Sequence, residues 1–244
     1  MSPYLHEWVF SHAAGNPDAP AIATRAVRLT YGDLAVRVRA LAARIQESGE
    51  RPHDHVLIAL PNVPATVVAS LANQMLGATA VEVNRDLGEA VLGAILAGLD
   101  IRFLFVAGRD IGKWSAVVRA RQIERIWVVQ RDRANAVLPD TIVGARSARL
   151  GDDGRVGREP TTASVQPYPN LDPSSPAVIL YTSGSTGQPH GVIQTHGNIA
   201  ANTRSIVEYL ALTHDDRALL TLPLHYCYGR SVLQTHLFVG GSLP

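Results

Sequence analysis

Short apolar runs alternate with helical periodicities along the first half of the chain. The runs are nearly continuous, which is typical of strands buried on both faces of a parallel sheet. Between them, apolar residues recur at the spacing of an amphipathic helix. We therefore predict an α/β fold with mainly parallel sheets and helices on both faces. The expected strands cover 56–60, 79–83, 101–106 and 125–130, and the expected helices cover 33–49, 64–76, 87–99 and 114–121.

Three residues mark expected helix ends in this half. Asp33 is predicted to cap the first helix, and Gly49 is predicted to end it. Pro64 is expected in the first turn of the second helix, where its missing N–H costs nothing.

The second half changes character. Residues 151–176 contain five prolines and three glycines, so we expect an irregular connection. It is either a flexible interdomain linker or a structured excursion within one larger domain. Beyond it we expect strands at 177–182, 191–195 and 219–222, a helix starting at Asn198, and a helix over 231–239 stopped by Gly240 and Gly241. The expected organisation is 1–150, 151–176 and 177–244.

Composition narrows the class of protein. The 244 residues are 46% hydrophobic and 18% charged, which provides a sizeable core and excludes intrinsic disorder. A net charge of +1 favours neither a nucleic-acid nor a membrane partner. The N-terminal residues do not resemble a signal peptide, and a single cysteine indicates a reducing compartment, so we expect a cytoplasmic protein. We expect Cys227 to be a small buried hydrophobic residue. The histidines, including His53 and His55, lack metal-ligand spacing, so no metal site is predicted.

The strongest chemical signal is the segment YTSGSTGQPHGV, residues 181–192. Its glycines permit close backbone approach, its N–H groups can form an anion-binding concavity, and its hydroxyls add donors. A polyphosphate is the ligand this favours. The segment is not the common nucleotide loop, because it lacks a Gly-Lys pair and a strand follows it. A bare hairpin turn is the alternative, but turns need only two to five residues. The candidate phosphate ligands are Thr182, Ser183, Gly184, Ser185, Thr186, Gly187 and His190.

These residues resemble the adenylate-forming (ANL) superfamily, which includes acyl-CoA synthetases, firefly-type luciferases and the adenylation domains of peptide synthetases. Residues 181–191 match the family pattern [YF]TSG[ST]TGxPKG at every position but one. Further similarity lies in LTYGDL, LPN, GATAVEVN, THGN and LPLHYCYG, at 29–34, 60–62, 77–84, 195–198 and 222–229.

The resemblance implies an AMP-forming ligase. A small carboxylic acid attacks the α-phosphorus of Mg²⁺-bound ATP, and coenzyme A or an acyl or peptidyl carrier protein then takes the acyl group. It also implies that the 222–229 segment lines the acyl pocket. The absence of Asp and Glu from 219–244 argues against an α-amino-acid substrate. No residue is assigned a catalytic role. The candidate substrate-binding residues are His225, Tyr226, Tyr228 and Gly229.

Two departures from the family pattern matter. His190 replaces a lysine, and an unperturbed histidine, with a pKa of about 6.5, is mostly neutral at pH 7. The family's later motifs, which supply groups for adenine, ribose and Mg²⁺ and a catalytic lysine, are absent, and Lys113 is misplaced for that role. We therefore expect an incomplete N-terminal large domain that is inactive alone and self-associates through its C-terminal edge. The alternatives are a non-catalytic nucleotide- or acyl-binding module and an interaction fragment.

Overall fold

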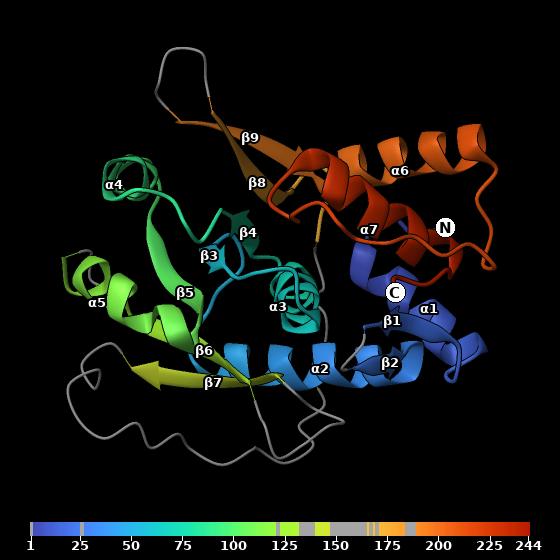
Figure 1. Cartoon of the computed structure of the whole chain (residues 1–244), viewed down its shortest axis with the longest axis horizontal. Helices are drawn as coiled ribbons and strands as arrows, with labels where there is room; N and C mark the ends of the chain where they lie inside the picture. The colour runs from blue at the N-terminus through green and yellow to red at the C-terminus, as the bar shows by residue number, and fades with distance from the viewer. Residues whose placement is uncertain are drawn as a thin grey trace.

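The computed structural model describes residues 2–24, 27–120, 123–131, 140–146, 165, 168, 171–183 and 189–244. Within these ranges a seven-stranded sheet forms the centre of the molecule. Its strands are β3 (His55–Ala59), β4 (Thr79–Glu82), β5 (Ile101–Ala107), β6 (Arg125–Arg131), β7 (Asp140–Arg146), β8 (Pro176–Ser183) and β9 (Pro189–Thr195). They lie in the order β7-β6-β5-β3-β4-β8-β9 (Figure 1).

The sheet is parallel except at its two edges. Every neighbouring pair from β6 through β5, β3 and β4 to β8 is parallel. The edge strands β7 and β9 run antiparallel to β6 and β8. The predicted α/β fold with a mainly parallel sheet is therefore confirmed.

Both faces of the sheet are buried. Successive strand residues point to opposite faces, and hydrophobic side chains pack on each of them. In β3, Val56 and Ile58 lie in one hydrophobic cluster, whereas Leu57 and Ala59 lie in the other. Figure 1 shows α4 and α5 on one side of the strands and α2 and α3 on the other. The helices are α1 (Leu5–Gly15), α2 (Tyr31–Glu47), α3 (Pro64–Met75), α4 (Glu89–Gly98), α5 (Ile111–Ala120), α6 (His196–Leu210) and α7 (Cys227–Val239), with a short 3₁₀ turn η1 (Gly108–Asp110).

Capping boxes begin two of these helices. The Thr30 side chain accepts a hydrogen bond from the Asp33 N–H at 3.1 Å, and Asp33 accepts one from the Thr30 N–H at 3.0 Å. Thr30 is thus the N-cap of α2, and the prediction of Asp33 as its cap was wrong. Thr195 and Asn198 repeat the arrangement at α6, which therefore begins earlier than predicted. α3 begins at Pro64, as predicted.

The two ends of the chain meet. β1 (Pro20–Ala23) and β2 (Arg28–Thr30) form an antiparallel hairpin that the sequence analysis did not predict. The Leu243 N–H donates to the Ala21 carbonyl at 3.0 Å, and the Leu243 carbonyl accepts from the Ala23 N–H at 2.8 Å. Figure 1 accordingly draws the C-terminus next to β1.

One predicted strand is wrong. Residues 219–222 form no strand, and Leu219 is 70% exposed. An apolar run becomes a strand only where a neighbouring strand accepts its hydrogen bonds, and an isolated bridge between Arg217 and Ser242 is the only pairing near this stretch within the described residues. The helix that follows, α7, ends as predicted at Gly240, whose φ of 80° is the left-handed conformation.

The connection at 151–176 lies largely outside the described residues. β8, which follows it, pairs in parallel with β4, which precedes it, so strands from both sides of the connection share one sheet. The division into 1–150, 151–176 and 177–244 stays a prediction.

Candidate functional site

The glycine-rich hairpin, residues 181–191, joins β8 to β9. Thr182 pairs with His190 and Ser183 pairs with Pro189, so the ends of the loop lie opposite one another. The predicted ligands Gly184, Ser185, Thr186 and Gly187 lie outside the described residues, as does the Ser183 side chain. The structure therefore fixes the two strands that carry the loop.

The hairpin lies at the edge of the sheet where parallel α/β proteins bind ligands. β8 runs parallel to β4, so Thr182 and Ser183 lie at the carboxyl end of the parallel strands. The Thr182 and His190 side chains are exposed, and the Thr182 hydroxyl is 3.5 Å from the His190 carbonyl oxygen. A ligand at this edge can therefore reach both residues from solvent.

Gly191 has a packing role in the same hairpin. A Cβ at this position would lie 3.1 Å from a methyl group of Ile179 and 3.2 Å from the Tyr181 ring. Tyr181 is the cross-strand partner of Gly191, and burial raises the pKa of its hydroxyl. The absence of a side chain at Gly191 thus leaves space for the ring of Tyr181.

The second candidate region is the aromatic segment, residues 222–229, which leads into α7. Tyr226 and Tyr228 are 55% and 67% exposed, so they are not core residues. Cys227 is also exposed, and its prediction as a buried hydrophobic residue was wrong. His225 is half-buried with its ring centroid 4.7 Å from that of Tyr226. The segment therefore presents two tyrosines and a thiol to solvent.

Gly229 and Asn62 hold this segment in place. A Cβ on Gly229 would lie 2.5 Å from the Pro223 carbonyl oxygen and 2.6 Å from that of Leu222. The Asn62 amide donates to the Leu222 carbonyl at 2.7 Å and accepts from the Leu224 N–H at 3.0 Å. The Asn62 side chain thus forms hydrogen bonds with the backbone of the segment, as a neighbouring strand would. The sequence analysis did not assign this role to Asn62.

A buried ion pair connects the aromatic segment to the sheet. Arg230, in the first turn of α7, bonds to Glu82, the last residue of β4. Glu82 is in register with Leu180 of β8, two residues before Thr182. Burial lowers the pKa of His225, while the neighbouring Glu82 carboxylate acts in the opposite direction. Sequence reasoning missed this pair, although a charge within each of two apolar runs was the available signal.

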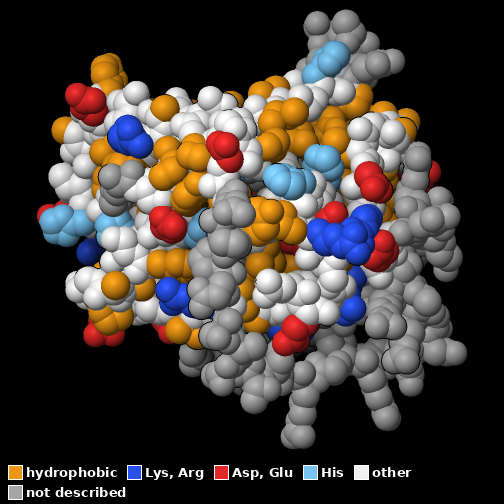
Figure 2. Space-filling model, turned by 180° about the vertical axis from the view of Figure 1, so that it is seen from behind, with side chains coloured by type: hydrophobic (Ala, Val, Ile, Leu, Met, Phe, Trp, Pro, Cys, Tyr) orange, Lys and Arg blue, Asp and Glu red, His pale blue; other side chains and the backbone are white. Residues whose placement is uncertain are grey.

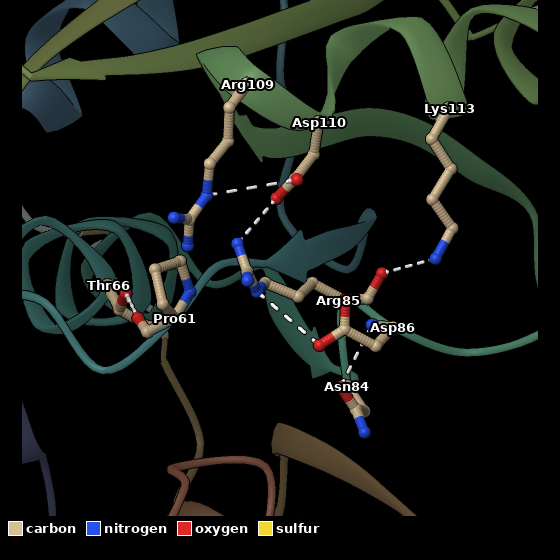
Figure 3. A network of polar contacts seen from close by, with 8 residues as sticks. All are labelled: Pro61, Thr66, Asn84, Arg85, Asp86, Arg109, Asp110 and Lys113. Atoms are coloured by element: carbon tan, nitrogen blue, oxygen red, sulfur yellow. Dashed lines mark hydrogen bonds and ion pairs between the residues drawn. The ribbon is translucent and has the colours of Figure 1, made fainter.

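A second polar network joins the loops at the carboxyl ends of the strands (Figure 3). Arg85, after β4, contacts Asp110 of η1 at 2.9 Å. Lys113 donates to the Arg85 carbonyl at 2.8 Å, and Arg109 lies 4.0 Å from Asp110. Lys113, the only lysine, is thus engaged in fixing a loop.

Charges of both signs are interspersed among hydrophobic side chains on the face in Figure 2. The described residues contain no group of three or more His, Cys, Asp or Glu side chains arranged to hold a metal ion. No helix in that part of the chain is long and apolar enough to cross a bilayer.

A family model described as AMP-binding enzyme matches residues 9–243. The chain belongs to this family. Among AMP-binding enzymes, feruloyl-CoA synthase of an Amycolatopsis species is 30% identical over 98% of the chain, which covers 43% of that protein. Pyochelin synthetase PchE of Pseudomonas aeruginosa is 31% identical over 98% of the chain, which covers 14% of it. The chain thus spans less than half the length of these two curated relatives.

Solved structures also share the fold of this AMP-binding enzyme chain. A long-chain-fatty-acid-CoA ligase from Archaeoglobus fulgidus superimposes with a TM-score of 0.79 at 22% identity, over 98% of the chain and 46% of that protein. MatB from Rhodopseudomonas palustris gives 0.76 at 19% identity, over all of the chain and 45% of MatB. At these identities the likeness establishes the fold alone.

Proposed function

We propose that this chain supplies the phosphate loop and one wall of the acyl pocket of an AMP-forming carboxylate ligase. The observation that carries the proposal is the position of the glycine-rich hairpin. In this chain, which belongs to the AMP-binding enzymes, the hairpin lies at the carboxyl edge of the parallel strands. The Arg230–Glu82 ion pair ties the aromatic segment to the neighbouring strand β4. The activity is that of the whole protein, with Mg²⁺-bound ATP as a substrate.

The proposed reaction has two steps. A carboxylate oxygen attacks the α-phosphorus of ATP, the bond to pyrophosphate breaks, and an acyl-adenylate forms. A thiol of coenzyme A or of a carrier-protein phosphopantetheine then attacks the acyl carbonyl and AMP leaves. In the first step, the N–H groups and hydroxyls of 182–187, with His190, orient the pyrophosphate and stabilise its growing charge.

The proposed substrate is a simple, fatty or aryl carboxylic acid. Two relatives are named feruloyl-CoA synthase and indoleacetate–CoA ligase, whereas two others are named pyochelin synthetase PchE and phenyloxazoline synthase MbtB. The aromatic segment contains no carboxylate to pair with an α-amine. His225, Tyr226, Tyr228 and Gly229 are proposed to contact the acid.

Calorimetric titration of the 244-residue chain with ATP, pyrophosphate and AMP tests the phosphate loop. ATP and pyrophosphate should bind, and AMP should bind at least tenfold more weakly, because it lacks the β- and γ-phosphates. Gly184→Val should abolish binding, and the remote control Gly93→Ala should preserve it. Equal affinity for AMP and ATP, with none for pyrophosphate, would refute the proposal.

We also expect the isolated chain not to catalyse ATP–pyrophosphate exchange with any carboxylic acid. The family's groups for adenine, ribose and Mg²⁺ belong to motifs that this sequence does not contain. Exchange above background from purified protein, with contaminating ligases excluded, would contradict this expectation.

Self-association is a separate proposal. Four large hydrophobic side chains between 219 and 228 are exposed: Leu219, Leu222, Tyr226 and Tyr228. Such surface favours association at high concentration. Light scattering should give an apparent mass that rises with concentration, and a monodisperse monomer throughout would count against it.

A further inference from the structure

Arg230 and Glu82 are nearly completely buried, with exposed fractions of 1% and 2%. Arg230 reaches three structural elements at once. It bonds to Glu82 at the end of β4, and its other terminal nitrogen donates to the Ser70 hydroxyl of α3 at 3.1 Å. Ser70 also accepts from the Gln74 amide at 3.0 Å. The guanidinium thus ties α7 to both the sheet and a core helix.

Stability alone does not account for this pair. Burying two charges carries a desolvation penalty that a well-packed apolar pair avoids. The pair is also incompletely satisfied, because Glu82 Oε2 and Arg230 Nε have no hydrogen-bond partner among the described residues. A hydrogen-bonded ion pair also fixes the relative orientation of its two side chains, because its hydrogen bonds form in one geometry. Apolar packing does not fix orientation in this way.

That geometry is transmitted directly to the aromatic segment. The Arg230 N–H donates to the Tyr226 carbonyl at 3.0 Å, so the position of Arg230 sets the first turn of α7. The opposite end of the pair is equally well placed, because Glu82 is in register with Leu180 on the strand that leads into the glycine-rich hairpin. The pair thus joins the start of α7 to the strand next to the one that leads into the glycine-rich hairpin.

We propose that Glu82 and Arg230 are positioning residues that fix the aromatic segment relative to the glycine-rich hairpin. They hold the backbone of 222–229 so that an acid on this segment faces the α-phosphorus of ATP held by the hairpin. The link to the acid rests on the proposed function, whereas the positioning of the segment does not.

The only cysteine in the chain makes a local test direct. Cys227 lies within the segment and is exposed, so a nitroxide attached there reports its mobility without further substitutions. The double variant Glu82→Leu/Arg230→Met removes the pair without leaving one buried charge alone. Leu233→Met is the matched control, because it alters a buried residue of α7 at nearly constant volume.

The mobile component of the electron paramagnetic resonance spectrum should at least double in the double variant. The thermal midpoint should stay within a few degrees of the wild-type value, and the control spectrum should be unchanged. A wild-type spectrum in the double variant, or equal mobility in the control, would overturn the positioning role. If the double variant does not fold, Glu82→Gln, which keeps the shape of the side chain, must produce the same mobile component or the proposal fails.

Kinetics of the longer protein test the link to the substrate. The double variant should raise KM for the carboxylate at least fivefold and leave KM for ATP unchanged. A mobile label with an unchanged KM for the acid would leave the positioning role supported and would overturn the assignment of the segment to the acyl pocket.

Discussion

Replacing Gly229 by alanine tests whether the backbone of the aromatic segment is as closely packed as the structure indicates. The new Cβ would lie 2.5 and 2.6 Å from two backbone carbonyl oxygens, those of Pro223 and Leu222, which cannot rotate away. Overpacking costs about 1–3 kcal/mol, and a clash with backbone atoms belongs in the upper part of that range, at about 2–3 kcal/mol. Alanine recovers about 1 kcal/mol of helix propensity, so the net loss of unfolding free energy should be about 1–2 kcal/mol.

Urea unfolding followed by circular dichroism measures this loss. For a chain of this length it corresponds to a fall in Tm of about 2–8 °C. Gly93→Ala in α4 is the matched control, because its Cβ would meet nothing within 4 Å. That change should stabilise the protein by about 0.5–1 kcal/mol. If Gly229→Ala were as stable as the wild type, the close contact between α7 and residues 222–223 would be wrong.

Three further changes have defined outcomes. Thr195→Ala should lower the free energy of unfolding by about 1 kcal/mol in urea, because α6 loses its N-cap, and an unchanged value would refute the cap. Burial lowers the pKa of His6 to about 3 and that of His196 to about 4. The unfolded chain therefore binds protons that the folded chain does not, and stability should fall from about pH 6.5 towards pH 4. His6→Phe should reduce that slope in urea titrations between these pH values, and an unchanged slope would contradict the assignment. In the longer protein, His190→Ala should lower the adenylation rate only modestly, and the rate of His190→Lys should equal or exceed that of the wild type. Gly184→Val should abolish adenylation. A His190→Ala rate as low as that of Gly184→Val would give the histidine a specific role.

Local patterns predicted most of the sheet and its helices. β3 and β4 coincide with predicted strands to within a residue or two, and Pro64 begins α3 as expected. The missed elements are α1, β1, β2 and β7. β1 and β2 pair with each other and β7 pairs with β6, whereas α1 is held by partners distant in sequence. α1, for instance, packs its Trp8 ring edge-on against Phe238, with ring centroids 4.9 Å apart. No spacing rule within a short window contains that information.

For the candidate site too, features carried by neighbouring residues could be predicted, and contacts between distant residues could not. The glycine-rich motif located the hairpin, because a loop that binds phosphate needs glycines for close backbone approach and hydroxyl residues as hydrogen-bond donors. Both residue types can be read directly from the sequence. The Glu82–Arg230 pair joins residues 148 positions apart, so its existence depends on the fold. Cys227 was wrongly expected to be buried for the same reason, since exposure at the first residue of α7 depends on which side the helix presents to the core.

The meeting of the chain ends has a consequence for synthesis on the ribosome. The His12 ring bonds to the Phe238 carbonyl at 3.0 Å across 226 residues, and the buried face of α1 shares its core cluster with Leu237 and Leu243. At about 5–20 residues per second, roughly 11–45 s separate the emergence of these partners. During that interval α1 can pack on α2 and α3, but its contacts with α7 and Leu243 cannot form. The native cover of α1 is therefore completed only after residues 237–243 have been synthesised, and until then part of its apolar side stays open to other partners, including chaperones.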